Sequence, residues 1–293
     1  MSAHGKKQSA KPKNNFRGAA GFDEWYTLVY GERWPRLRAA LGGEPAPVCW
    51  NAGARAVSAA DVSTPYYLDR GSILAALALP LDGAERILDM CAAPGGKTVV
   101  LASMMPDGAL LTANERSAAR RARLAKTIAA CLPPDVQRRV RVTGADAAAL
   151  CRHANTHEQY DRILLDAPCS SERHVLRDAR YLNEWSYSRI RSLAAAQWSL
   201  ISSAYRLLAR GGKLVYATCA LSPEENDCII ERFTAKYPDM TVTGLPQIPR
   251  AEAARFCADP LSAYEQTRCG FHVLPDVQSG AGPLFFSCLN KAP

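Results

Sequence analysis

The sequence predicts an α/β protein with a mostly parallel, doubly wound sheet, helices on both faces of that sheet and a late antiparallel strand. The first observation is that short runs typical of strands alternate with longer stretches of helical spacing from Arg86 onward. The second is that the first of these runs ends in a tight Pro-Gly-Gly turn, and an apolar stretch with helical spacing follows. Together they indicate the strand–loop–helix opening of a nucleotide-binding α/β domain.

The composition divides the chain into three parts. Residues 1–20 are rich in Lys, Ser, Ala and Asn and are expected to form a basic, disordered tail; a short organelle-targeting segment would have a similar composition. Residues 21–80 are expected to form an N-terminal helical cap. Residues 81–293 then carry the α/β domain.

Within the cap, the spacing of aromatic and apolar residues predicts helices. Phe22 to Leu41 has them at helical spacing, and Pro35 interrupts the run, which predicts two short helices. Core packing explains this segment better than contact with a nucleic acid, which its Trp, Tyr and Arg residues would also suit. Gly42 to Ser63 is expected to be a connector of loops, and Gly71 to Leu79 a helix that precedes the sheet.

The α/β domain alternates between the two kinds of element. Strands are expected at 86–90, 109–113, 139–143, 160–166 and 213–218. Helices are expected near 94–104, 116–131, 189–209 and 223–236. Two later strand candidates, Met240 to Thr243 and Leu284 to Leu289, are separated by a long connection that contains Pro and Gly.

The net charge of +8 is unevenly distributed. Met1 to Phe22 contains five basic residues and no acidic residue, and Glu115 to Arg141 contains eight basic and two acidic residues. The remainder of the chain therefore has a net charge of about −3 (8 − 5 − 6). Clustering of this kind favours a polyanionic partner such as nucleic acid, although a solvated tail and a solvated helix face would show the same pattern.

Other bulk features narrow the class of protein. The longest apolar run, Ile73 to Leu81, is too short to span a bilayer, and the N-terminus has no apolar segment typical of a secretory signal, so an intracellular protein without membrane contact is expected. The ten cysteines include no Cys-x-x-Cys pair. Neither a zinc site or other metal site nor a disulfide framework is expected.

Polar side chains follow each predicted strand, where open α/β sheets bind their ligands. Glu115 follows the second strand, and a carboxylate there can accept hydrogen bonds from both hydroxyls of a ribose. Asp146 follows the third strand and suits an adenine amino group. A phosphate-binding loop would need Gly where Cys91 stands, and the pattern G-x-G-x-x-G is absent. S-adenosyl-L-methionine (S-adenosylmethionine) therefore fits this edge better than a dinucleotide.

Two cysteines lie at neighbouring strand ends, Cys169 after the fourth strand and Cys219 after the fifth. A thiolate is a strong nucleophile, and methylation of carbon 5 of a pyrimidine needs one, because addition of the thiolate at carbon 6 makes carbon 5 reactive. Asp166, three residues before Cys169, can support the addition from the N3 side of the ring. The alternative is that both are buried structural cysteines.

These residues resemble the Nop/Sun family of RNA cytosine-5 methyltransferases. The matching stretches are Leu88 to Thr98, Asp166-Ala167-Pro168-Cys169-Ser170, and Tyr216 to Asn226, which contains Thr218-Cys219 and Ser222-Pro223-Glu224-Glu225-Asn226. Their order and spacing agree with the family from about Phe22 to the C-terminus. The resemblance implies a Rossmann-like, S-adenosylmethionine-dependent methyltransferase fold and makes residues 81–293 the catalytic domain.

The resemblance also assigns roles to individual residues. It implies that Cys219 is the nucleophile, that Cys169 helps to release the product and that Asp166 contacts both the cofactor and the base. DNA cytosine-5 enzymes attack with the thiol of the Pro-Cys motif instead, so Thr218-Cys219 is an argument for RNA. The implied cofactor contacts are Cys91, Ala92, Ala93, Pro94, Gly95, Gly96, Lys97, Glu115, Arg120, Asp146 and Asp166.

Two departures from the family pattern are mild: Glu115 stands where Asp is frequent, and Ala220 where Ser is frequent. The leading Phe-Asp and Tyr-Gly-Glu-Arg-Trp-Pro segments, without a sizeable extra RNA-binding domain, look like the short branch that acts on small-subunit ribosomal RNA. The implied partner is rRNA or the ribosomal small subunit; no feature indicates a protein partner. The expected location is cytoplasmic, with a mitochondrial alternative.

RNA as the partner gives the helical cap a second expected role as an RNA-contacting segment and makes several basic side chains candidates for contact with the RNA backbone. They are Arg116, Arg121, Arg123, Arg173, His174, Arg177 and Arg180. Two other functions stay open. One is a ribosome assembly factor that uses the fold mainly to bind RNA, and the other is a Rossmann oxidoreductase, which the missing glycine pattern disfavours.

Overall fold

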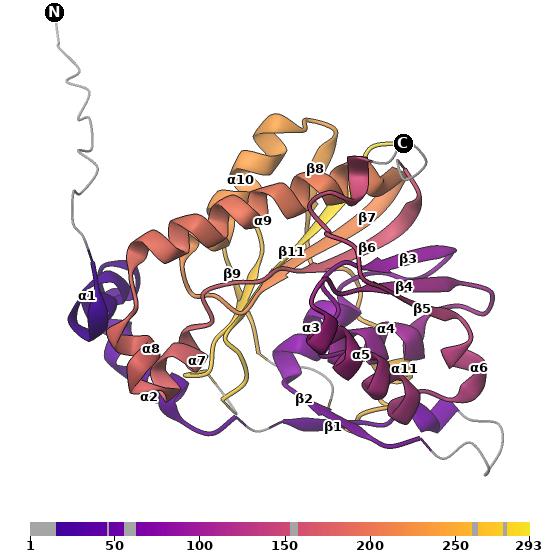
Figure 1. The fold of residues 1–293 in the computed structure, drawn as a ribbon, viewed down its shortest axis with the longest axis horizontal. Helices are drawn as coiled ribbons and strands as arrows, with labels where there is room; N and C mark the ends of the chain where they lie inside the picture. Colours follow the sequence, from indigo (N-terminus) through magenta and orange to yellow (C-terminus); the bar gives the residue numbers. More distant parts are fainter. Residues whose placement is uncertain (1–15, 46, 56–62, 153–157, 260–262, 278–279) are drawn as a thin grey trace, which may run out of the picture.

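The computed structural model describes residues 16–45, 47–55, 63–152, 158–259, 263–277 and 280–293 (Figure 1). The predicted basic tail therefore lies outside the described residues as far as residue 15. In the described part of the chain, no helix has the length and the apolar character that crossing a bilayer requires.

Nine strands form one mixed sheet in the described residues. The parallel part consists of β3 (Arg86–Asp89), β4 (Leu110–Asn114), β5 (Val140–Thr143), β6 (Tyr160–Asp166) and β7 (Leu208–Thr218), in the order β5-β4-β3-β6-β7. The antiparallel part consists of β8 (Met240–Thr243), β9 (Glu265–Gln266), β10 (Phe271–Val273) and β11 (Leu284–Lys291), with β11 beside β7. The predicted doubly wound sheet with a late antiparallel strand is confirmed.

The alternation of side chains along the strands explains why helices cover both faces (Figure 1). Ile87 packs in one core with α3 (Arg70–Leu77), α4 (Gly96–Met104) and α5 (Ala118–Cys131). Leu88 points the other way, into a second core with α9 (Tyr187–Leu207) and α10 (Asp227–Lys236). Neighbouring residues of β6 and β7 divide between the two cores in the same way.

The cap begins with α1 (Gly18–Tyr30), η1 (Gly31–Arg33) and α2 (Trp34–Gly42). The two predicted helices are present, but the break lies at Gly31, whose φ of 57° is unfavourable for residues with a side chain, and not at Pro35. Pro35 lies in the first turn of α2, where no intrahelical N–H is needed. An aromatic cluster including Phe22, Tyr26 and Trp34 buries the inner faces of both helices.

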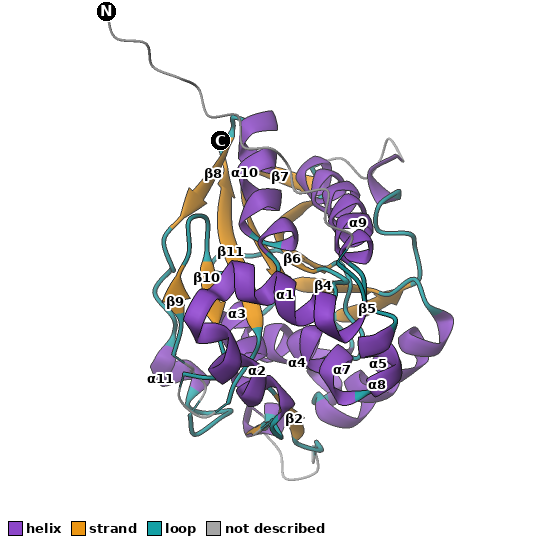
Figure 2. Cartoon of the chain, turned by 90° about the vertical axis from the view of Figure 1, so that its left-hand side faces the viewer, coloured by secondary structure: helices purple, strands orange, loops and turns teal. Residues whose placement is uncertain are grey.

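The cluster that these helices form also includes residues of two short helices after β6, namely α7 (Glu172–Arg177) and α8 (Ala179–Asn183). Figure 2 shows α1, α2, α7 and α8 together on the side that faces the viewer. The remaining short helices are α6 (Pro134–Gln137), α11 (Arg250–Ala253), η2 (Ala52–Arg55), η3 (Leu150–Arg152) and η5 (Pro223–Glu225).

Three further predictions of local structure were wrong. The connector at 42–63 contains a strand, β1 (Val48–Trp50), which pairs with β2 (Tyr66–Leu68). β7 begins at Leu208, five residues early, because Leu208 already pairs with Tyr160 of β6, ahead of an irregularity in register after which Lys213 pairs with Arg162. The helix expected at 223–236 is divided at Asn226, whose side chain binds the preceding loop.

Candidate active site

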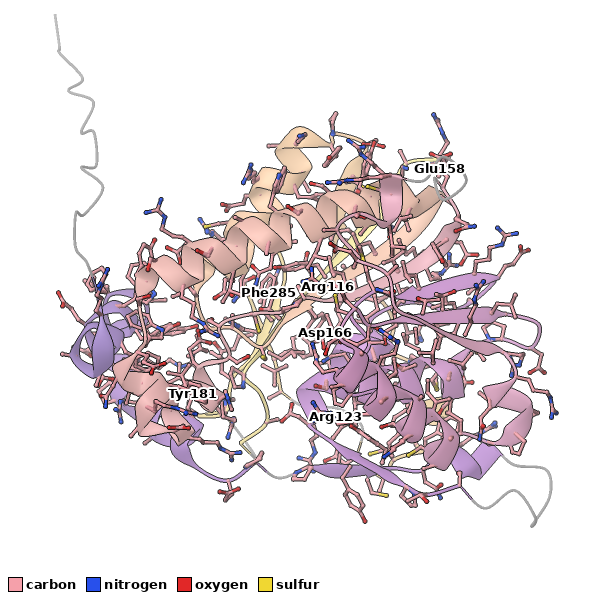
Figure 3. All side chains as sticks on the ribbon, viewed as in Figure 1. Arg116, Arg123, Glu158, Asp166, Tyr181 and Phe285 are labelled. Atoms are coloured by element: carbon pink, nitrogen blue, oxygen red, sulfur yellow. The ribbon has the colours of Figure 1, made fainter. Side chains whose placement is uncertain are left out.

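The order of the parallel strands places a switch point between β3 and β6, because their crossover connections leave in opposite directions. The loops after β3, β6 and β7 meet at the carboxyl edge of the sheet. Figure 3 labels Asp166 at this end of β6 and Glu158 just before its start. Two cavities open at this edge, and the chain from Asp166 to Pro168 contributes to both.

The first cavity, of about 600 Å³, brings together the residues predicted to hold a nucleoside. Its lining includes Cys91, Glu115, Arg120 and Asp146 together with Pro168. These side chains come from segments after β3, β4, β5 and β6, as the sequence predicted for a ligand at the strand ends. The cavity is therefore the candidate cofactor pocket.

Glu115 is the buried acid of this pocket. Its Oε1 accepts a hydrogen bond from the N–H of Ser117 at 2.8 Å, and its Oε2 lies 3.1 Å from a guanidinium nitrogen of Arg120. Asp146 is half-exposed and 3.5 Å from Arg116. Burial raises the pKa of the Cys91 thiol, so this side chain is a neutral wall of the pocket.

The turn from Ala92 to Gly96, predicted to contact the cofactor, follows Cys91 but lines neither of the two cavities; it packs against the protein. Gly95 has a φ of 116°, and a Cβ on it would lie 3.0 Å from Thr127; a Cβ on Gly96 would lie 2.8 Å from the Tyr66 ring. The carbonyl of Ala93 accepts a hydrogen bond from Arg120 at 2.8 Å. Pro94 stands between them, in a cis peptide bond after Ala93. The close approach that these glycines allow is to Tyr66 and Thr127.

The second cavity, of about 370 Å³, contains the nucleophile candidate. Cys219, Asp166 and Lys97 line it, and Lys97 Nζ lies 2.7 Å from Asp166 Oδ2. Lys97, predicted as a cofactor contact, thus faces the same cavity as Cys219. Burial is the largest single influence on the pKa of Lys97 and lowers it, but the charge of Asp166, its hydrogen bond to Lys97 and the nearby Cys219 and Asp89 together raise the pKa, so the ammonium form is stable.

The two candidate thiols are in contact. Cys169 Sγ and Cys219 Sγ are 3.0 Å apart, and the N–H of Cys219 donates to Cys169 Sγ at 3.2 Å. Ser171 Oγ lies 3.1 Å from Cys219 Sγ. Donation from the Cys169 thiol and the Ser171 hydroxyl lowers the pKa of Cys219, while Cys169 keeps its proton because its own pKa is raised by this bond and by burial. Cys219 is therefore the thiol that ionises more easily.

The basic side chains predicted to bind RNA are distributed over both cavities and beyond them. Arg173, His174 and Arg177 line the second cavity, and Arg116 the first, whereas Arg123 is exposed on α5 (Figure 3). The guanidinium of Arg173 donates to the carbonyls of three glycines at 2.9–3.0 Å. Arg173 is thus part of the cavity wall. Arg121 binds backbone carbonyls, and Arg180 lies over the Tyr181 ring and 3.6 Å from Asp178.

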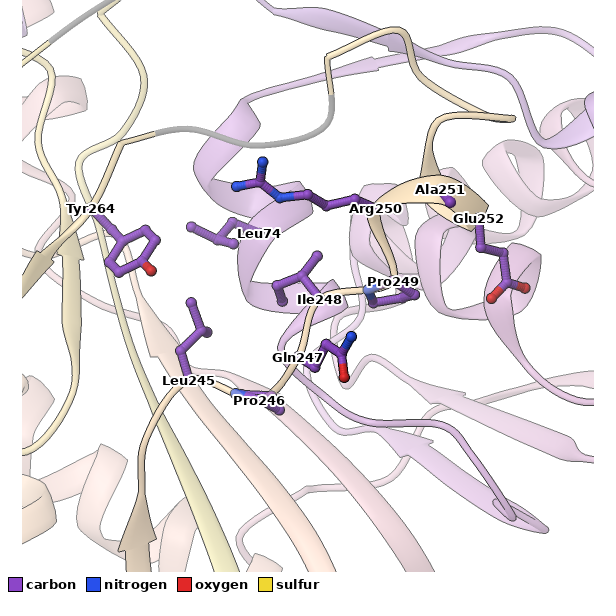
Figure 4. A pocket seen from close by; sticks show the side chains of 10 residues that line it. All are labelled: Leu74, Leu245, Pro246, Gln247, Ile248, Pro249, Arg250, Ala251, Glu252 and Tyr264. Carbon is purple, nitrogen blue, oxygen red and sulfur yellow. The ribbon is translucent and has the colours of Figure 1, made fainter.

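Two further observations limit the choice of site. The cavity in Figure 4, of about 640 Å³, is lined mainly by the segment from Leu245 to Glu252 and includes neither thiol. Among the described residues, no three His, Cys, Asp or Glu side chains gather as metal ligands would.

Sequence reasoning missed Ser171, Asp69 and Ser72, which line the Cys219 cavity, because no motif marks them.

Comparisons with known proteins show which family the chain belongs to. A model of the family described as 16S rRNA methyltransferase RsmB/F matches residues 76–268. The chain is 39% identical to ribosomal RNA small subunit methyltransferase F of Cronobacter sakazakii, covering 77% of this chain and 44% of that protein. It is 33% identical to 5-cytosine rRNA methyltransferase NSUN4 of Xenopus laevis (77% and 56%). It is also 33% identical to the mitochondrial tRNA (cytosine(34)-C(5))-methyltransferase of Danio rerio (77% and 60%).

The chain spans about half the length of the curated relatives it matches. Among solved structures, a methyltransferase homolog protein from Pyrococcus horikoshii superposes with a TM-score of 0.68 at 20% identity, covering 92% of this chain and 94% of that one. This likeness shows the Rossmann-like methyltransferase fold. The extent of the family match and the identity to these relatives confirm the resemblance drawn from the motifs: the chain belongs to the 16S rRNA methyltransferase RsmB/F family, within Nop/Sun.

Proposed function

We propose that this protein is an S-adenosylmethionine-dependent methyltransferase that acts on carbon 5 of a cytosine in RNA. The observation that carries the proposal is the pair of thiols, Cys169 and Cys219, 3.0 Å apart beside the cavity that also holds Asp166 and Lys97. The neighbouring nucleoside-sized cavity and the family membership support it.

The reaction begins with Cys219. Its thiolate adds to carbon 6 of the cytosine, and the bond from Sγ to carbon 6 makes carbon 5 nucleophilic. The lowered pKa of Cys219 provides the thiolate. Asp166 and Lys97 face the same cavity as an ion pair, so a carboxylate can accept from the exocyclic amino group while the ammonium stabilises negative charge that develops on the ring.

Release of the product involves Cys169. Once water has taken the proton of carbon 5, the electron pair of that C–H bond forms the double bond between carbons 5 and 6, and the electron pair of the carbon 6–Sγ bond returns to Cys219. The neutral thiol of Cys169, 3.0 Å away, donates a hydrogen bond to the thiolate that leaves. The raised pKa of Cys169 keeps this proton available.

The residues of the first cavity fit the cofactor. Glu115 is buried and suits the ribose hydroxyls, Asp146 suits the adenine amino group, and Cys91 and Arg120 complete the lining. S-adenosylmethionine supplies the methyl group when bound. Ala92, Ala93, Pro94, Gly95 and Gly96 form the turn that follows Cys91, and Asp166 lines the neighbouring Cys219 cavity; we propose that both also contact the cofactor.

The substrate that we propose is small-subunit rRNA, alone or within the ribosomal subunit, as in two of the relatives named above. The third relative is a tRNA enzyme, so tRNA is the second candidate. We further propose a cytoplasmic location, with a mitochondrial alternative. We also propose a division of the chain into a basic tail (1–20), a helical, RNA-contacting cap (21–80) and a catalytic domain (81–293).

Covalent trapping tests the proposal. Wild type, Cys169→Ala and Cys219→Ala are each mixed with S-adenosylmethionine and small-subunit rRNA, ribosomal subunits or tRNA, and then run on a denaturing gel. A protein–RNA adduct is expected to accumulate in Cys169→Ala and to be missing in Cys219→Ala. The reverse pattern would make Cys169 the nucleophile. If none of these RNAs forms an adduct or accepts a methyl group, the result would favour an assembly factor that binds RNA through the same fold.

A further inference from the structure

A buried polar network lies directly behind the two thiols. Glu172, the first residue of α7, and Glu225, the last residue of η5, have no exposed surface. Ser170 Oγ is hydrogen-bonded to Oε1 of Glu172 and to Oε2 of Glu225. A hydroxyl has a single proton, so Ser170 can donate to one carboxylate only. The other contact needs a proton on the second carboxyl group.

Glu172 joins this network to the loop of the nucleophile candidate. Its Oε2 accepts from the N–H of Leu221 at 2.9 Å, two residues after Cys219. Its Oε1 accepts from the hydroxyl of Tyr26 at 2.5 Å. The carboxyl group therefore connects the Cys219 loop to Ser170 and to helix α1.

Glu225 joins the network to the loop of the other thiol. Its Oε1 accepts from the N–H of Ser170, the residue after Cys169, at 3.0 Å. Gln197 of α9 donates to the same oxygen and to the carbonyl of Pro168, both at 2.9 Å. The loop that carries Cys169 is thus held on both sides of the thiol.

The surroundings of the pair favour the shared proton. Burial and the neighbouring Glu172 carboxylate raise the pKa of Glu225 to about 8, and burial raises the pKa of Glu172. The titratable groups that interact with the pair include Tyr26 and Tyr30 of α1, Tyr216 of β7, Cys169 and Cys219, each of which is neutral when protonated.

We propose that Glu172 and Glu225 share one proton through Ser170 and thereby hold the two cysteine loops at the spacing that brings the thiols into contact. They are positioning residues, and their importance for methylation rests on the proposed function. Loss of the shared proton places two carboxylates against one hydroxyl in a buried site. Their repulsion separates the Cys169 loop from the Cys219 loop.

Phenylarsine oxide tests whether the two thiols lie close together, and it does so without methyl transfer. It condenses with two neighbouring thiols and releases water. The rate at which the reagent bridges thiols is followed by intact mass. The bridging that is lost in both Cys169→Ser and Cys219→Ser is assigned to this pair of thiols. Glu225→Gln keeps the network, since an amide can donate to Ser170 as the protonated carboxyl does, but it cannot ionise. Dividing its rate by the wild-type rate at each pH cancels the ionisation of the thiols.

The bridging rate of Glu225→Gln divided by that of wild type is expected to be about 1 at pH 6.5 and about 10 at pH 9. At pH 9 a group with a pKa of about 8 is about nine-tenths ionised. Ser170→Ala is expected to slow bridging at least tenfold at pH 7. Its matched control is Ser287→Ala, which removes another buried hydroxyl donor, on β11, and should leave the rate within twofold.

A ratio that stays near 1 up to pH 9, or a Ser170→Ala rate equal to that of Ser287→Ala, would overturn the positioning role. Failure of the proposed function gives a different result. In that case bridging depends on Glu225 as described, but wild type transfers no methyl group to RNA.

Discussion

At the scale of single residues, Lys97 and Glu115 lie in different cavities and are expected to have different roles. Lys97 lies beside Asp166 in the Cys219 cavity, whereas Glu115 is buried in the neighbouring pocket. Lys97→Met should therefore reduce methyl transfer at least 100-fold and change the Kd of S-adenosylmethionine by less than threefold. Glu115→Ala should weaken cofactor binding about 10- to 100-fold, since hydrogen bonds to a charged group contribute about 1.5–3 kcal/mol.

Single-turnover rates and calorimetric titration with the cofactor separate these two effects. Glu231→Ala is the control for loss of an exposed acidic side chain, because it pairs with Arg268 away from both cavities. If Lys97→Met instead lost cofactor affinity as Glu115→Ala does, Lys97 would belong with the cofactor contacts, as its position in the motif first indicated.

Three of the residues that sequence reasoning found lie at the ends of strands: Glu115 follows β4, Asp166 ends β6 and Cys219 follows β7. The period of the strands locates Glu115, Asp166 and Cys219 because parallel strands bring their carboxyl ends to one edge. The hydrogen-bonded network behind the two thiols has no such signal in the sequence. Tyr26 and Glu172 are 146 positions apart, and only the folded chain brings the two together.

At the scale of elements, the turn between β3 and α4 needs glycine for two separate reasons. Gly95 has a φ of 116°, and a Cβ there would lie 3.0 Å from Thr127. Gly83 also has a positive φ, 66°, but no atom lies within 4 Å of its Cβ position. Gly83→Ala should cost about 1 kcal/mol of unfolding free energy, and Gly95→Ala about 2–4 kcal/mol, because strain and crowding add.

Urea unfolding of both variants measures this difference, and Thr127→Ser in the Gly95→Ala background should recover part of it by relieving the contact. Equal destabilisation of the two glycine variants would mean that only the backbone conformation matters at Gly95. In that case Thr127 would not restrict the turn.

Strands of four residues or more were predicted from the sequence, and strands of two or three residues were not. β6 and α9 carry enough residues for a period to be recognised, whereas β1, β9 and β10 have two or three residues each. β1 pairs with β2, and β10 pairs with both β9 and β11, partners that a run of two or three residues does not indicate. The division at Asn226 was also hidden, because its cause is a side-chain bond to Thr218.

At the scale of the whole molecule, the uneven charge predicts where RNA binds. Arg123 and Lys126 are exposed on α5, which follows the strand end that carries Glu115. Arg206 and Arg210 are exposed near the opposite edge of the sheet, where β7 begins. The first pair lies on the helix that follows Glu115 in the chain, whereas the second pair lies where α9 ends and β7 begins.

Reversing both charges on α5, with Arg123→Glu and Lys126→Glu, should weaken RNA binding at least tenfold at low salt. The slope of log K against log salt should become shallower, since each phosphate that the protein no longer neutralises removes about 0.7 to 0.9 from it. Binding of S-adenosylmethionine should not change. The control, Arg206→Glu with Arg210→Glu, alters the net charge equally, so an equal loss of RNA affinity would show that only the overall charge matters and that the cavity edge has no special role in binding.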